Sequence, residues 1–176
     1  KHFGFVSPFL QRLFVSGNAT LLKGNVRFNG SELDGIYTIY GGYRNRPPMG
    51  LSPLSYNAGI SWEENRIGVA INYGYVGRKI RYAGANEFLD EYEAPRSTLD
   101  AQLSMRLAKG KMEIKLNVSD LLAEPYIIYR NAWKYVDGQA YEQFLDGTWD
   151  YEEDKDTALR KSWKGRTFSA SVSWKF

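Results

Sequence analysis

The chain has no cysteine, and it has a single histidine among its 176 residues. The absence of cysteine excludes disulfides and thiolate chemistry, and it leaves the cellular compartment open. The single histidine, His2, stands near the N-terminal end, which argues against a Ser-His-Asp triad and against a histidine metal centre. We therefore expect no enzyme activity, no metal site and no cofactor.

Long apolar runs and concentrated charge are also missing. No stretch of 18 apolar residues is present, so the sequence predicts no transmembrane helix. The 23 basic and 20 acidic residues are spread along the chain, which gives a formal net charge of +3. Such a dispersed charge leaves no footprint for nucleic acid, and we expect no nucleic-acid partner.

Alternation of apolar and polar residues is the dominant pattern that the sequence does contain. In the segment 167–176, every second residue is apolar, and serine, threonine or lysine stands between them. This period of two is typical of β-strands, and it argues against helix because polar residues at every second position interrupt any apolar helical stripe. The pattern predicts an all-β, antiparallel chain with strands at about 11–24, 51–63, 66–80, 96–108, 111–122 and 165–176.

The length and the order of these segments indicate a transmembrane β-barrel. Each alternating core covers about nine or ten residues, and a strand of that length tilted by about 40° spans about 25 Å, the apolar thickness of an outer membrane. Tight turns, expected near Glu64–Asn65 and Lys109–Gly110, alternate with long segments at about 25–50, 81–95 and 123–164. Outer-membrane barrels sort their connections in this way, with short periplasmic turns and long extracellular loops.

Alternation alone does not determine which face points outward. A soluble β-cup turns its apolar face inward, whereas a membrane barrel turns it toward lipid. The polar faces here carry Asp100, Arg106, Glu113 and Lys115, which are too many charges for a small dry interior. We therefore expect lipid outside and a polar lumen, and the residues expected to face the lumen or a plug are Asn57, Asn72, Asp100, Gln102, Arg106 and Asn117.

The long segments are rich in tyrosine, tryptophan and arginine. These side chains supply contact area and hydrogen-bond donors at low entropic cost. They are suited to binding a sugar, a siderophore or a lid protein, and packing against one another above the membrane explains them equally well. The candidates for extracellular binding are Tyr40, Tyr43, Arg44, Tyr129, Trp133, Tyr135 and Trp149.

Two charged clusters lie beside these aromatics. The acidic run at 150–156 lacks the glycine and the ligand spacing of an EF-hand loop, so a solvated loop tip is the preferred interpretation over Ca²⁺ binding. The basic cluster of Arg78, Lys79 and Arg81 follows directly after an expected strand. At that position it can meet the phosphates of lipopolysaccharide.

Several segments resemble known outer-membrane proteins. The ending RTFSASVSWKF resembles the C-terminal signal that the barrel-assembly machinery recognises, with signal residues Phe168, Ala170, Val172, Trp174 and Phe176. The run from RPPMGLSPLSYNAGISW to NYGYVGRKI, followed by EYEAPRSTLDAQLSMRL and KMEIKLNVSDLL, resembles the last strands of TonB-dependent receptors of the Bacteroidota type. The matching pieces are Ser52–Asn57, Asn72–Ile80, Pro95–Asp100 and Asn117–Leu122. The resemblance covers about 10–122 and 165–176.

The resemblance implies an outer-membrane transporter of a Gram-negative bacterium. Such a receptor has a 22-stranded barrel with an N-terminal plug, and it imports a scarce nutrient (siderophore, cobalamin, glycan or peptide) with energy from the TonB complex. The implied partners are outer-membrane lipid and lipopolysaccharide, the rest of the barrel and its plug, the TonB complex through the missing N-terminal part, and a surface lipoprotein lid. The C-terminus is expected on the periplasmic side.

Six strands are fewer than the usual minimum of about eight for a closed barrel. We therefore expect 1–176 to be the C-terminal segment of a larger barrel. Two alternatives remain: a small complete barrel of eight strands with a structural or binding role, which would draw extra strands from 1–10 and 123–164, and a soluble β-cup that binds an apolar ligand.

Overall fold

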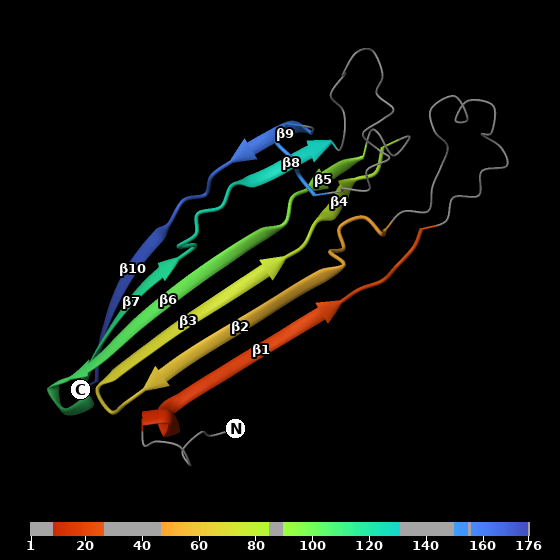
Figure 1. The fold of residues 1–176 in the computed structure, drawn as a ribbon. Coiled ribbons are helices and arrows are strands. Elements are labelled where there is room, and N and C mark those ends of the chain that lie inside the picture. The colour runs from red at the N-terminus through yellow and green to blue at the C-terminus, as the bar shows by residue number, and fades with distance from the viewer. Residues whose placement is uncertain (1–8, 27–46, 85–89, 131–149, 155, 176) are drawn as a thin grey trace, which may run out of the picture.

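The computed structural model describes residues 9–26, 47–84, 90–130, 150–154 and 156–175. The described chain is all-β and antiparallel, as the alternation predicted, and its helices are short 3₁₀ turns at Phe9–Arg12 and Ala108–Gly110. No described helix is long and apolar enough to cross a membrane. A six-stranded sheet has the order β1-β2-β3-β6-β7-β10, and a four-stranded sheet has the order β4-β5-β8-β9 (Figure 1).

The bounds of the strands follow the alternating segments closely. Each of the six segments predicted as a strand contains one strand of the larger sheet. These strands are β1 (Leu13–Leu21), β2 (Leu54–Glu63), β3 (Ile67–Val76), β6 (Arg96–Leu107), β7 (Met112–Ser119) and β10 (Thr167–Trp174).

Both predicted tight turns are present. Between β2 and β3, Glu64 and Ile67 exchange backbone hydrogen bonds of 2.8 and 3.2 Å. Between β6 and β7, the chain reverses through Ala108–Gly110, where all three residues have positive φ. In Figure 1, both turns lie at the end of the larger sheet that is remote from the four-stranded sheet.

The prediction of long loops at 81–95 and 123–164 was wrong in part, because these segments contain strands. The smaller sheet consists of β4 (Lys79–Tyr82), β5 (Glu91–Glu93), β8 (Tyr126–Arg130) and β9 (Thr157–Ser162). Its order repeats that of β3, β6, β7 and β10, so four strands of the larger sheet continue into it after a short break. The third expected loop, 25–50, lies largely outside the described residues.

The pairing register is kept across the break. Val76 pairs with Arg96 at the end of β3 and β6, and Lys79 pairs with Glu93 three residues further along both strands. On the other side, Ser119 pairs with Thr167 and Tyr126 pairs with Ser162. The connection from Ser119 to Tyr126 is therefore two residues longer than the connection from Ser162 to Thr167. An even difference leaves the side-chain alternation unchanged, because successive residues of a strand point to opposite faces.

The buried core lies in the smaller sheet. The buried hydrophobic residues in the described part of the chain are Ile80, Tyr92, Ile127, Ile128 and Tyr129. In the larger sheet, by contrast, large apolar side chains are exposed: Phe168 is 71% exposed and Val172 is 67% exposed. The larger sheet therefore presents an apolar face that no described residue covers.

The larger sheet is open within the described residues. β1 pairs with β2 alone and β10 pairs with β7 alone, so these two strands form its outer edges. Figure 1 shows them on opposite sides of the sheet, β1 in red and β10 in blue.

Candidate functional site

The pairing register divides the larger sheet into two faces of opposite chemistry. On one side, Asn18 pairs with Asn57, and Asn72 pairs with Asp100. Gln102 pairs with Asn117 on the same side. We call this side the polar face, and it carries all six residues predicted to face a lumen or plug: Asn57, Asn72, Asp100, Gln102, Arg106 and Asn117.

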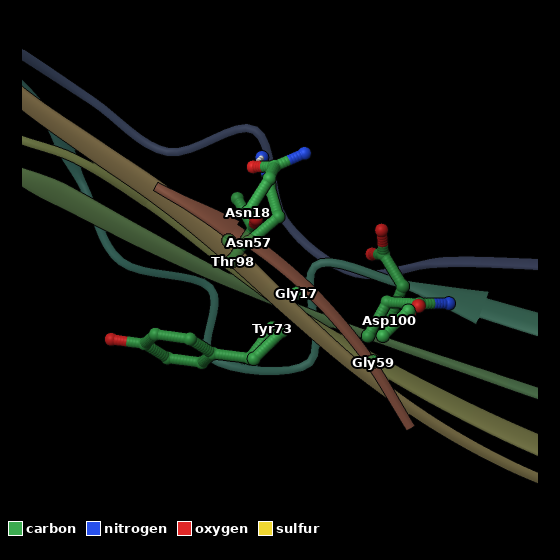
Figure 2. Close-up of a pocket in the computed structure, with 11 residues that line it drawn as sticks. Gly17, Asn18, Asn57, Gly59, Tyr73, Thr98 and Asp100 are labelled. Carbon is green, nitrogen blue, oxygen red and sulfur yellow. Dashed lines mark hydrogen bonds between the residues drawn. The ribbon is translucent and has the colours of Figure 1, made fainter. Parts of the chain in front are cut away.

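A hollow of about 380 Å³ opens on the polar face, across β1, β2, β3 and β6. Figure 2 shows Asn18, Asn57, Thr98 and Asp100 on one side of the sheet, while Tyr73 points to the opposite side. The polar side chains of its lining are Ser16, Asn18, Asn57, Asn72, Thr98 and Asp100. A solvated barrel interior needs a polar, hollowed face of this kind, whereas a soluble cup would line its interior with apolar groups.

Glycines form the floor of this hollow. A Cβ atom at Gly59 would lie 2.5 Å from Asn72 Oδ1 and 2.7 Å from Ser16 Oγ. At Gly74, it would lie 2.9 Å from Thr98 Oγ1. Neighbouring amide and hydroxyl groups therefore lie directly over the backbone, and the floor offers hydrogen-bonding groups at close range.

A second hollow, of about 240 Å³, lies nearer the tight turns and contains a chain of ion pairs. Arg106 pairs with Glu63 at 2.7 Å and with Glu113 at 3.6 Å, and Lys115 pairs with Glu113 at 3.2 Å. The two cations and two carboxylates balance. Charges at this density are stable on a wetted surface and unfavourable in a dry core.

Asp100 has a structural partner as well as a place in the larger hollow. Its Oδ1 accepts a hydrogen bond of 2.9 Å from the backbone N–H of Asp120. Asp120 has φ +59 and forms an ion pair with Arg96, whose Nε also donates to the backbone carbonyl of Glu124 at 3.2 Å. We call this group (Arg96, Asp100, Asp120 and Glu124) the joint, because it holds the break between β7 and β8.

The opposite face of the larger sheet is apolar and carries no charged residue on its six described strands. Tyr56 and Tyr75 stack with ring centroids 4.9 Å apart near the break, and Tyr73 hydrogen-bonds Ser97 at 2.8 Å. Trp62 and Trp174 stand at the other end. We call this side the apolar face, and its rows include Val15, Ile60, Ile71, Ala101, Val118 and Phe168.

The residues predicted as an assembly signal have a common side. Phe168, Ala170, Val172 and Trp174 pair with the apolar row of β7 and belong to the apolar face. Phe176 lies outside the described residues. Their role as a signal stays a prediction.

Tyr129 was wrongly predicted to bind a ligand from a loop. It belongs to β8, its exposed fraction is 0%, and its ring packs 5.7 Å from Tyr92 and 5.3 Å from Tyr151. Burial raises the pKa of its phenol well above the ordinary value. The other loop candidates lie outside the described residues: Tyr40, Tyr43, Arg44, Trp133, Tyr135 and Trp149.

The two charged clusters differ from a simple solvated surface. Arg78 lies over the ring of Tyr92 at 5.6 Å and pairs with Asp150 at 3.6 Å, and Lys79 pairs with Glu93 at 3.0 Å. In the acidic run, Asp156 is 4% exposed and accepts a hydrogen bond of 2.7 Å from the Glu152 N–H. The part of the chain that the structure describes holds no group of three or more carboxylate, histidine or cysteine residues placed to bind a metal.

Several residues of the site were not predicted. Ser16, Thr98 and the floor glycines stand at polar positions of the alternation, so the period of two could have revealed them. The joint had no such signal, because Asp120 and Glu124 lie between strands.

Comparison of the chain with protein-family models, with curated proteins and with solved structures gave no match.

Proposed function

We propose that this chain is part of the transmembrane barrel of an outer-membrane transporter, of the TonB-dependent receptor type. The observation that carries the proposal is the division of one six-stranded sheet into an uncharged apolar face and a hollowed polar face. Exposed apolar surfaces of this extent are unfavourable in water and mark contact with lipid or with another protein. Lipid is favoured because aromatic side chains stand at both ends of the apolar face, as in outer-membrane barrels.

The two open edges favour a larger barrel. In hydrocarbon, each unpaired backbone N–H or C=O group costs several kcal/mol, so a membrane sheet must close through further strands. A small complete barrel would draw its extra strands from 1–10 and 123–164. The described strands of 123–164, β8 and β9, pair in the smaller sheet instead.

The polar face supports a transport role. Amide, hydroxyl and carboxylate groups line the larger hollow, and they offer hydrogen-bonding partners to a plug or to a polar substrate. The nutrient classes that fit the proposal are a siderophore, cobalamin, a glycan or a peptide. In the complete receptor, the TonB complex would supply the energy, and a surface lipoprotein is a further partner.

Fractionation of cells that produce the parent protein tests the membrane part of the proposal. We expect the protein in the outer-membrane fraction, released by detergent and not by high salt, with a mobility in gels that changes on heating, as folded barrels show. Recovery in the soluble fraction would overturn it. The transport part is tested by nutrient uptake in strains with and without the TonB complex, and uptake that is equal in both would contradict TonB dependence.

A further inference from the structure

At the break between the sheets, the two sides of the chain exchange their chemistry. The side that is apolar in the larger sheet is charged in the smaller sheet, and the side that is polar in the larger sheet is apolar in the smaller one. Because the register is kept there, Lys79 and Glu93 continue the side of Tyr75 and Ser97, which is the apolar face. Ile80 and Tyr92 continue the polar face, and they belong to the buried cluster of the smaller sheet. The outward side is therefore apolar below the break and charged above it.

Charged side chains stand on the outward side of β4, β5 and β9, and Ile128 of β8 lies buried between Glu93 and Arg160. Glu93 pairs with Ile128, which pairs with Arg160, so that Lys79, Glu93 and Arg160 lie in one transverse row. Lys79 and Glu93 form an ion pair at 3.0 Å, and the Tyr126 hydroxyl donates to Glu93 at 2.7 Å. We call the group formed by Lys79, Arg81, Tyr126 and Arg160 the basic patch.

Two arginines give the basic patch its excess positive charge. Arg81 and Arg160 are exposed, and no described carboxylate forms an ion pair with either of them. Both lie close enough to Tyr126 to lower the pKa of its phenol, against the larger raising effects of burial and of Glu93. The nearby carboxylates, Glu91 and Glu93, already pair with Arg130 and Lys79.

We propose that the basic patch binds the phosphate groups of the glycolipid in the outer leaflet. Lys79 follows Tyr75 by four residues, so the patch stands about 13 Å beyond the tyrosines at the end of the apolar face. A phosphorylated lipid whose acyl chains cover the apolar face carries its head group at this height, on this side. Guanidinium groups suit it because they bind phosphate through two parallel hydrogen bonds.

This inference rests on the proposed function, and it changes the membership of the basic cluster that the sequence predicted, which was Arg78, Lys79 and Arg81. Arg78 stacks on Tyr92 and pairs with Asp150 on the inward side, so it does not belong to the patch. Arg160, more than 70 residues further along the chain, takes its place.

The test measures binding of diphosphorylated lipid A to the detergent-extracted parent protein by native mass spectrometry. The test variants are Arg81→Gln and Arg160→Gln, each alone, to match the single charge that the control removes, and both together. The matched control is Lys161→Gln, because Lys161 is the exposed neighbour of Arg160 on β9 and pairs in register with Ile127 of the inward side. Each basic residue near an anionic membrane surface contributes about fivefold to binding, so the double variant should bind about 25-fold more weakly. The control should bind like the parent.

Three outcomes would overturn the inference. One is an equal loss in the control, which would indicate net charge alone. Another is equal binding of lipid A from which both phosphates have been removed. The third is an unchanged affinity of the double variant, which would leave a protein partner as the reason for the patch. The proposed function fails separately, if the parent protein itself is absent from the outer-membrane fraction.

Discussion

At the scale of single residues, neighbours on one strand have opposite surroundings. Leu103 of β6 pairs with Val69 and Leu116 in the middle of the apolar face, and Gln102 pairs with Ala70 and Asn117 on the polar face. We expect Leu103→Arg to lower the free energy of unfolding by about 2–4 kcal/mol, because in the proposed membrane barrel it would place a charge near the bilayer midplane. Gln102→Arg should change it by no more than about 0.5 kcal/mol.

Urea unfolding of both variants in lipid vesicles measures this difference. Each variant is the control of the other, since the same side chain is introduced one residue away. A greater loss in Gln102→Arg would mean that the polar face is the covered one, and the soluble cup would then be the better interpretation.

Tyr129 gives a pH-dependent prediction. Burial raises the pKa of Tyr129 in the folded state, so its contribution to stability is complete below the ordinary tyrosine pKa of about 10. Above that pH the unfolded chain loses the proton while the folded chain keeps it, and stability falls by up to about 1.4 kcal/mol per pH unit. Tyr129→Phe should remove this loss.

Thermal unfolding between pH 8 and pH 11 checks the effect. The melting temperature of the parent protein should exceed that of Tyr129→Phe by less and less as the pH rises. Tyr82→Phe is the control, because Tyr82 is 60% exposed in the same sheet and should show a constant difference. A constant difference for Tyr129→Phe would contradict the assignment of Tyr129 to the core.

At the scale of elements, the joint connects the two sheets. The side chains of Arg96 and Asp120 are 24% and 11% exposed, so their ion pair is largely shielded from water. Asp120→Asn retains a residue that tolerates positive φ and removes the charge. We expect it to cost about 2–3 kcal/mol, because it leaves the Arg96 guanidinium without its ionic partner.

Hydrogen exchange of the amides of β8 measures the effect of Asp120→Asn where the joint acts. Glu64→Gln is the control, because the Arg12–Glu64 pair is 43% and 47% exposed and contributes at most about 1 kcal/mol. Similar effects of the two substitutions would show that the joint is an ordinary surface contact.

Strands that separate an apolar face from a polar one could be predicted from the sequence, and the strands of the smaller sheet could not. β5 has three residues, which is too short to show a period. β8 carries Ile127, Ile128 and Tyr129 in succession, because both of its faces are covered and alternation disappears. For the same reason, composition could not distinguish Tyr129 from an exposed binding residue.

The polar face was predictable to the same extent. Its rows follow from the period of two, since residues of one parity share a side. Its hollow was not, because the space above Gly59 depends on the side chains of Asn72 and Ser16, which come from two other strands. Cross-strand register, which the sequence does not specify directly, determines such contacts.

At the scale of the whole molecule, the distance between the outer strands separates a large barrel from a small one. β1 and β10 are five strand spacings apart in the sheet order, about 24 Å along the sheet. In a closed barrel of eight strands they would be three spacings apart, about 14 Å, measured around the other side. The two barrels also differ in which strand lies nearer to β10. In a large barrel β2 is closer to β10 than β1 is. In a small closed barrel β2 is farther from β10 than β1 is.

Distances between pairs of spin labels on the parent protein show whether β1 or β2 lies nearer to β10. These 176 residues contain no cysteine, so within them labels attach only at introduced positions, and any cysteine elsewhere in the parent protein is replaced beforehand. Thr20 and Ser55 pair directly on the polar face of β1 and β2, and Ser169 belongs to the same face of β10. We expect the distance to a label at Ser169→Cys to be shorter from Ser55→Cys than from Thr20→Cys, by about one strand spacing, 5 Å. A longer distance from Ser55→Cys would mean that β1 and β10 approach each other around a small closed barrel.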